Sequence, residues 1–234
     1  PPPCPRSPNE WANGAALHCL PPFSPSPPAP PPQDRASFRH VLHARPGWPF
    51  VLGCQLGYVL GDGGLTVTTT VTNLGATACP YGTGAHPYLS AGVPVIDRAR
   101  IRVPGPVYLP VDDAGIPTGT KPVDGTRYDL REEQELGDRQ LDVSYTSLRR
   151  DGDGKARVRL TGPAGPAVAL WVDQAYPYLE IFTGDALPEA GKRRTGLGVE
   201  PMTCAPDAFN SGAGLITLEP GQTHSASWGI EPGT

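Results

Sequence analysis

Residues 50–73, FVLGCQLGYVLGDGGLTVTTTVTN, decide the fold. Their second half, residues 65–73, is rich in β-branched side chains that alternate between two faces, which is typical of a β-strand. The first half is apolar, and the G-D-G-G sequence at 61–64 between the two halves is a strong turn signal. The stretch therefore predicts an antiparallel β-hairpin.

Strand-like runs separated by turn residues continue along the chain. We expect a second hairpin from residues 143–149 and 156–161, which flank an Asp-Gly-Asp-Gly turn. A third hairpin is expected from residues 168–173 and 178–183. Single strands are also expected at residues 37–43, 99–103 and 107–111.

The C-terminal part repeats the hairpin pattern, with residues 214–218 and 224–230 on either side of a Glu-Pro-Gly turn. Residues 130–142 are polar and acidic, and we expect a loop there with at most one helical turn. No long helix is expected anywhere. Many short strands without intervening helices predict an all-β protein, a large antiparallel sandwich or barrel.

Residues 1–35 differ in composition from the rest, because they contain thirteen of the 31 prolines. A proline run such as 21–32 is expected to be extended, irregular chain and not a central strand or a helix. We therefore divide the chain into an irregular N-terminal segment, residues 1–35, and a β-sandwich domain, residues 36–234. The segment also contains His18 in a stretch, NGAALH, that is not of low complexity.

Composition argues against several classes of partner. The net charge is −4 and no basic block is present, so neither nucleic acid nor a membrane is expected as partner. No apolar run approaches the roughly 20 residues that span a bilayer, and no signal peptide is visible, so a cytoplasmic location is expected. The histidines and cysteines show no metal-binding spacing, and Gly82 and Gly84 precede no helix. We expect no metal and no cofactor.

Three residues are candidates for chemistry. His86 lies in a Gly/Pro-rich turn after a strand, where an imidazole can act as an acid or base; a structural histidine is equally compatible with that turn. Glu200 follows a strand-like stretch and precedes an irregular loop, a common place for a catalytic carboxylate, although a surface ion pair is the simpler reading. Asp173 ends a strand and fits a turn-capping role at least as well.

Several motifs, taken in order, resemble the aldose 1-epimerase (galactose mutarotase) family. They are PYGTGAHPYL at 80–89, WVDQ at 171–174, FTGD at 182–185, EPMTCAPDAFNSG at 200–212 and the closing L-x-PG and WGI between 218 and 230. The similarity runs from about residue 36 to 231. It implies a large antiparallel β-sandwich of the galactose mutarotase type.

The resemblance also implies a function: interconversion of the α and β anomers of a free aldohexose through the open-chain sugar, without a cofactor. It implies that Glu200 is the general base on the C1 hydroxyl and His86 the general acid at the ring oxygen, facing each other across the sugar site. Asp173 and His18 match sugar-binding positions, although Cys19 stands where the family has glycine. The family's N-terminal strands, with a substrate-binding arginine, have no counterpart in the sequence, so an N-terminally disrupted member is expected.

Two alternatives remain open from the sequence. One is a non-catalytic, carbohydrate-binding relic of the same fold. The other is a hexose 6-phosphate epimerase, which needs a basic cluster for the phosphate; Arg149–Arg150 and residues 192–194 are the candidates. A sugar is the expected small-molecule partner, and a monomer or weak dimer is the expected state.

Overall fold

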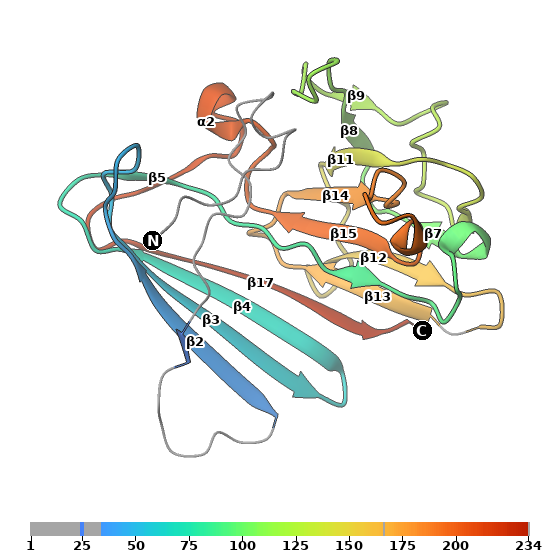
Figure 1. The fold of residues 1–234 in the computed structure, drawn as a ribbon, viewed down its shortest axis with the longest axis horizontal. Coiled ribbons are helices and arrows are strands. Elements are labelled where there is room, and N and C mark those ends of the chain that lie inside the picture. Colours follow the sequence, from blue (N-terminus) through green and yellow to red (C-terminus); the bar gives the residue numbers. More distant parts are fainter. Residues whose placement is uncertain (1–23, 26–33, 166, 234) are drawn as a thin grey trace.

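The computed structural model describes residues 24–25, 34–165 and 167–233. In these ranges the chain forms a nine-stranded sheet, a six-stranded sheet and a two-stranded ribbon (Figure 1). All strand pairs are antiparallel. The prediction of an all-β antiparallel sandwich is thus confirmed.

The nine-stranded sheet has the spatial order β1 (Ser24–Pro25), β2 (Arg35–Leu42), β3 (Leu52–Gly61), β4 (Gly64–Asn73), β17 (Thr223–Pro232), β13 (Ala167–Val172), β12 (Ala156–Thr161), β7 (Arg100–Arg102) and β10 (Gln134–Glu135). The six-stranded sheet has the order β6 (Tyr88–Leu89), β15 (Leu197–Met202), β14 (Tyr178–Phe182), β11 (Asp142–Thr146), β8 (Val107–Leu109) and β9 (Lys121–Pro122). The ribbon pairs β16 (Ile216–Leu218) with β5 (Cys79–Tyr81).

The first predicted hairpin is confirmed as β3 and β4, which pair along their whole length and close with Gly61 opposite Gly64. β17 pairs with the other edge of β4. The threonines of β4 face the hydroxyl groups of β17, and three cross-strand side-chain hydrogen bonds of 2.8–3.2 Å join them. The alternation read from residues 65–73 therefore separates an apolar core face from a hydroxyl-rich outer face.

The other three predicted hairpins are wrong, because their strands lie in different sheets. β11 belongs to the six-stranded sheet, whereas β12 belongs to the nine-stranded sheet. β13 and β14 are separated in the same way, and β16 pairs with β5 instead of β17. At the first two of these turns the chain crosses from one layer of the sandwich to the other. Alternation shows which side chains face the core, but both layers share that core, so it does not assign a strand to a sheet.

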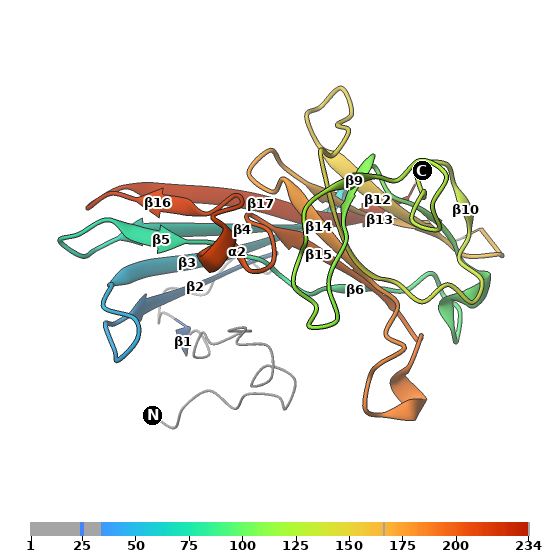
Figure 2. The same ribbon diagram turned by 90° about the horizontal axis from the view of Figure 1, so that it is seen from above.

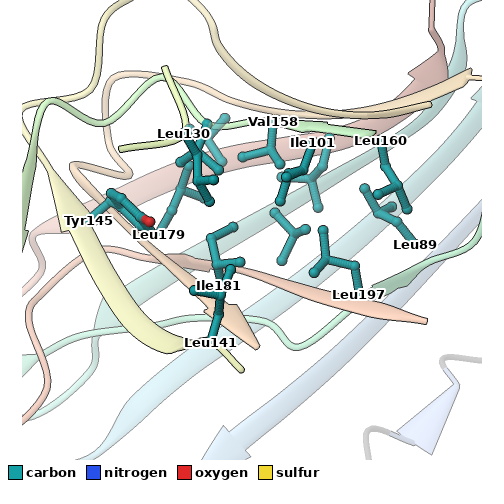
Figure 3. Close-up of a cluster of buried hydrophobic side chains, with 14 of the residues drawn as sticks. Leu89, Ile101, Leu130, Leu141, Tyr145, Val158, Leu160, Leu179, Ile181 and Leu197 are labelled. Carbon is teal, nitrogen blue, oxygen red and sulfur yellow. The ribbon is translucent and has the colours of Figure 1, made fainter. Parts of the chain in front are cut away.

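The main core lies between the two sheets. Ile101, Val158 and Leu160 contribute from the nine-stranded sheet, and Leu179 and Ile181 contribute from the six-stranded sheet (Figure 3). All five side chains are fully buried. A smaller cluster packs the far end of the long strands against the ribbon and includes Leu52, Val71 and Leu218. Figure 2 shows this ribbon extending away from the six-stranded sheet.

The single strands predicted at residues 37–43, 99–103 and 107–111 are present as β2, β7 and β8. The two described proline-region residues, β1, pair only with the edge of β2, the kind of position at which proline is tolerated in a sheet. Residues 130–142 contain the short strand β10 and no helical turn. Among the residues that the structure describes, the helical elements are η1 (Ile96–Arg98), η2 (Ala190–Lys192) and α2 (Ala208–Ser211). Within the described ranges, none of the helices is long and apolar enough to cross a membrane.

Candidate active site

The loop that carries His86 runs alongside β15 and is hydrogen-bonded to it. The backbone N–H of Thr203 donates to the carbonyl of Thr83, and that of Ala85 donates to the carbonyl of Pro201 at 3.1 Å. Gly84 makes this approach possible, because a Cβ atom at this position would lie 2.8 Å from the Pro201 oxygen. The φ angle of Gly84 is not positive, so glycine is needed here to let the loop backbone approach β15 closely and not to form an unusual turn.

This arrangement brings His86 and Glu200 into direct contact. The His86 Nε2 atom lies 2.9 Å from Glu200 Oε1, and the two side chains are 30% and 17% exposed. The sequence predicted both residues at one site, and the structure brings them together. It holds them in contact, with no space for a sugar ring between them.

Neighbouring groups fix the orientation of the imidazole. The ring stacks on Tyr88, with centroids 4.9 Å apart and an angle of 20° between the planes. It also meets the edge of Phe182 at 6.2 Å. Gly198 leaves room beneath it, since a Cβ there would lie 3.3 Å from His86 Cε1. The position of the imidazole is therefore set by packing on two sides as well as by its bond to Glu200.

The hydrogen bond with Glu200 raises the pKa of His86, and this outweighs the lowering effect of burial. The charge of Asp142 acts in the same direction. The protonated imidazole is thus favoured on this face of the sheet. A protonated imidazole beside a carboxylate supplies one proton donor and one proton acceptor at the same point.

Two further carboxyl groups lie on this face, and neither was predicted from the sequence. Glu180 on β14 is directly opposite Glu200 on β15 and opposite Ser144 on β11. Asp142 lies two residues before Ser144 and so on the same face. Burial raises the pKa of Asp142, and it raises that of Glu180 well above its ordinary value. The available signal for Glu180 was a lone acid inside the otherwise apolar and aromatic strand Tyr178–Phe182.

Asp173 occupies a turn-capping position at the corner between β13 and β14. Its Oδ2 accepts a 2.7 Å hydrogen bond from the backbone N–H of Ser227, and its Oδ1 accepts one from Ala175 at 3.0 Å. The structural alternative raised by the sequence is therefore realised. Met202, at the end of β15, pairs with Tyr178 at the start of β14, so Asp173 and the end of the Glu200 strand lie at the same edge of the sandwich. His18 lies outside the described residues.

No group of three or more His, Cys, Asp or Glu side chains in the described part of the chain is arranged to hold a metal ion. The cysteines that are described, Cys54, Cys79 and Cys204, are free. The imidazole and carboxyl groups on the face around His86 are able to exchange protons with a bound molecule.

Comparison with known proteins gives a consistent result. The sequence profile of a family described as Aldose 1-epimerase matches residues 17–231. The chain is 31% identical over 186 residues to the uncharacterized protein YihR of Escherichia coli K12. This alignment covers 79% of this chain and 57% of YihR. The chain is also 30% identical over 169 residues to the galactose mutarotase of Mus musculus, covering 68% of this chain and 48% of that one. The chain thus spans about half the length of the curated relatives it matches.

The fold is also shared with solved structures. The crystal structure of a GalM/aldose epimerase homologue from Caenorhabditis elegans superimposes with a TM-score of 0.73 at 17% identity, over 91% of this chain and 69% of that one. At this identity the likeness shows a common fold, the large antiparallel sandwich of the galactose mutarotase type.

Proposed function

Because the chain belongs to the aldose 1-epimerase family, we propose that it interconverts the α and β anomers of a free aldohexose. The observation that carries the proposal is the 2.9 Å contact between His86 and Glu200 on the outer face of the six-stranded sheet. An imidazole and a carboxylate at one point provide the acid and the base that opening a hemiacetal requires.

In the proposed reaction, Glu200 removes the proton from the C1 hydroxyl. The electrons of that O–H bond form the C1 carbonyl, the bond between C1 and the ring oxygen breaks, and His86 protonates the ring oxygen. Rotation about the C1–C2 bond exposes the other face of the carbonyl. Reclosure returns one proton to His86 and one to the C1 oxygen, so the protein ends as it began.

The direct contact of the two side chains is compatible with this chemistry. The C1 hydroxyl oxygen and the ring oxygen are bonded to the same carbon, so an acid and a base that reach them need not be a sugar ring apart. In the proposal the sugar separates the two side chains. Its C1 hydroxyl donates a hydrogen bond to Glu200, and its ring oxygen accepts one from His86. The raised pKa of His86 keeps the imidazole protonated and ready to donate.

Asp173 and His18 are proposed to bind sugar hydroxyls. For Asp173 this role adds to its two bonds from backbone N–H groups, because each carboxylate oxygen has a further lone pair. His18 enters the proposal through sequence similarity alone.

A free sugar is favoured over a sugar phosphate, because most of the basic residues suggested for phosphate are engaged elsewhere. Arg150 donates to the carbonyls of Val172 and Tyr176 at 3.1 Å. Arg194 is bonded to Asp97 and Asp185, at 2.6 and 2.9 Å.

The test is a polarimetric or NMR measurement of anomer exchange with the purified chain on glucose, galactose and glucose 6-phosphate. We expect faster exchange of a free hexose than in buffer alone and little acceleration of glucose 6-phosphate. A preference for glucose 6-phosphate would support the phosphosugar alternative. Sugar binding without any acceleration would reject catalysis and support the non-catalytic relic.

A further inference from the structure

The carboxyl group of Glu180 has no role in the proposed acid–base mechanism. It lies on β14 between Ser144 on β11 and Glu200 on β15, its register partners in the two neighbouring strands. Register partners in an antiparallel sheet have Cβ atoms about 5 Å apart on the same face. The three side chains therefore form one row across the sheet, and Glu200 at its end contacts His86.

The surroundings of Glu180 contain one hydrogen-bond donor and several acids. The Ser144 hydroxyl donates to Glu180 Oε2. Within the described residues Glu180 makes no ion pair with arginine or lysine. The titratable groups around it are the carboxyl groups of Asp142 and Glu200, the imidazole of His86 beyond Glu200, the phenol of Tyr178 on its own strand and that of Tyr145 behind the sheet.

A second negative charge is unfavourable in this position. Burial is the largest cause that raises the pKa of Glu180, and the charges of Asp142 and Glu200 raise it further; the Ser144 hydroxyl acts in the opposite direction. A protonated carboxyl group differs chemically from a carboxylate, because it has an O–H that can donate. The nearest anionic acceptor on its row is Glu200, and a neutral acid beside a carboxylate is the usual arrangement of two close carboxyl groups.

We propose that Glu180 is a positioning residue: as an uncharged carboxylic acid between Ser144 and Glu200, it donates a hydrogen bond to the Glu200 carboxylate and so orients the base and limits its basicity. This inference rests on the proposed function, in which Glu200 removes the C1 proton. When Glu200 accepts that proton, the Glu180 hydroxyl turns to Ser144 Oγ, which can accept in place of donating. Glu180 keeps its own proton throughout, and the proton held by Glu200 returns to the C1 oxygen on reclosure.

The protonation state is measured on protein labelled with ¹³C at the glutamate side-chain carboxyl carbon. Glu180→Gln and Glu200→Gln assign the two resonances by their loss. We expect the Glu180 carboxyl to be neutral at about pH 6, where an unperturbed glutamate is ionised. An ionised Glu180 at that pH overturns the proposal.

The positioning role is tested with Glu180→Leu, which keeps the size of the side chain and removes the donor. Without that donor Glu200 binds a proton more readily, so the acidic limb of the pH–rate profile moves up by about one pH unit. We expect kcat/KM near the limb to fall about tenfold and Glu180→Gln, whose amide also donates, to recover most of it. A limb that does not move in Glu180→Leu overturns the proposal, because a merely structural residue would leave it in place.

The same comparison is available without catalysis, through the pH titration of the Glu200 carboxyl resonance in the wild type and in Glu180→Leu. A chain without mutarotase activity would reject the proposed function. The Glu200 titration still decides the interaction in that case: a shift to higher pH in Glu180→Leu supports it, and an unchanged titration overturns it. Glu219→Gln, a change at an exposed glutamate in a turn, is the matched control.

Discussion

The two outer faces of the sandwich carry charge in different ways. On the nine-stranded sheet, arginines are matched by acids. Arg157 donates to Asp151 at 2.8 Å, to Asp153 at 2.6 Å and to Glu231 at 2.7 Å. Five arginines line a depression of about 50 Å³ at this side, together with Glu132 and Asp151. The charges on this arginine face are largely neutralised within the protein.

On the six-stranded sheet the balance is reversed. The carboxyl groups of Asp142, Glu180 and Glu200 gather on adjacent strands. Within the described residues, His86 provides a cationic partner for this acidic face through its contact with Glu200. The pKa values of Asp142 and Glu180 are raised, whereas that of Asp153 on the arginine face is lowered by its bond to Arg157.

The difference separates structural charge from functional charge. Matched ion pairs hold loops in place and leave no group poised to exchange a proton. Unmatched carboxyl groups raise the energy of the folded state, and such perturbed groups cluster at functional sites. The candidate site is therefore recognisable as the face whose charges are not neutralised by the protein itself.

The largest expected effect is a loss of kcat when proton-transfer groups on the acidic face are replaced, with no loss for a matching change on the arginine face. Glu200→Gln and His86→Asn each remove one proton-transfer group, and we expect kcat to fall by about 100-fold or more. Glu231→Gln, a change of the same chemistry on the arginine face, should leave kcat unaltered. Anomer exchange followed by NMR measures all three. Near wild-type turnover in Glu200→Gln would contradict the assigned base.

A glycine on each face gives the second comparison. A Cβ at Gly198 would press on His86 Cε1 at 3.3 Å, so Gly198→Ala is expected to displace the imidazole and lower kcat by about 10- to 100-fold. A Cβ at Gly229 would lie 2.3 Å from the Leu65 carbonyl oxygen and 2.5 Å from Trp171 Cε2. Gly229→Ala should therefore lower the free energy of unfolding by about 1–3 kcal/mol.

Thermal denaturation and kcat measured on both glycine variants separate the two effects. Gly229→Ala that remains folded should have wild-type kcat. A loss of kcat in Gly229→Ala equal to that in Gly198→Ala would contradict the distinction between the faces.

The sequence predicted the parts of the molecule that depend on neighbouring residues. Residues 50–73 contain both strands and their turn, and the hairpin was predicted correctly. Residues 143–161 also contain two strands and a turn, but the strands belong to different sheets. Pairing across a sandwich depends on residues far apart in the chain, and local alternation carries no information about it.

The site divides in the same way. His86 and Glu200 came from motifs quoted in the sequence, and they are in contact. Glu180 and Asp142 were missed, because their proximity to Glu200 follows from the register of β11, β14 and β15. For Asp173 the sequence offered a turn-capping role, which the bond from Ala175 fills. The bond from Ser227 could not be foreseen, since Ser227 lies on a strand 54 residues away.

A smaller effect tests whether the arginine face is structural. Arg157→Gln leaves Asp151, Asp153 and Glu231 without their cation. Since these pairs are partly exposed, we expect a loss of about 1 kcal/mol or less in the free energy of unfolding, and less still at high salt. Urea denaturation at low and high salt measures it. A change in kcat without a change in stability would show that this face also takes part in the reaction.

The smallest expected effect is the pH dependence of stability, which should have opposite signs on the two faces. The raised pKa of Glu180 means that its contribution to stability is complete below its ordinary value of 4.5 and is lost as pH rises toward the folded value. The Glu180→Gln side chain cannot ionise and does not lose this contribution, so the variant's melting temperature should rise relative to that of the wild type as pH rises above 4.5.

The pKa of Asp153 is lowered, so its contribution to stability is present above its ordinary value of 3.8 and is lost as pH falls. Asp153→Asn should thus be less stable than the wild type near neutral pH and approach it in acid. If the melting temperatures of the two variants, relative to the wild type, changed with pH in the same direction, the contrast would be contradicted. The acidic face would then not differ from the arginine face in how its charges are neutralised.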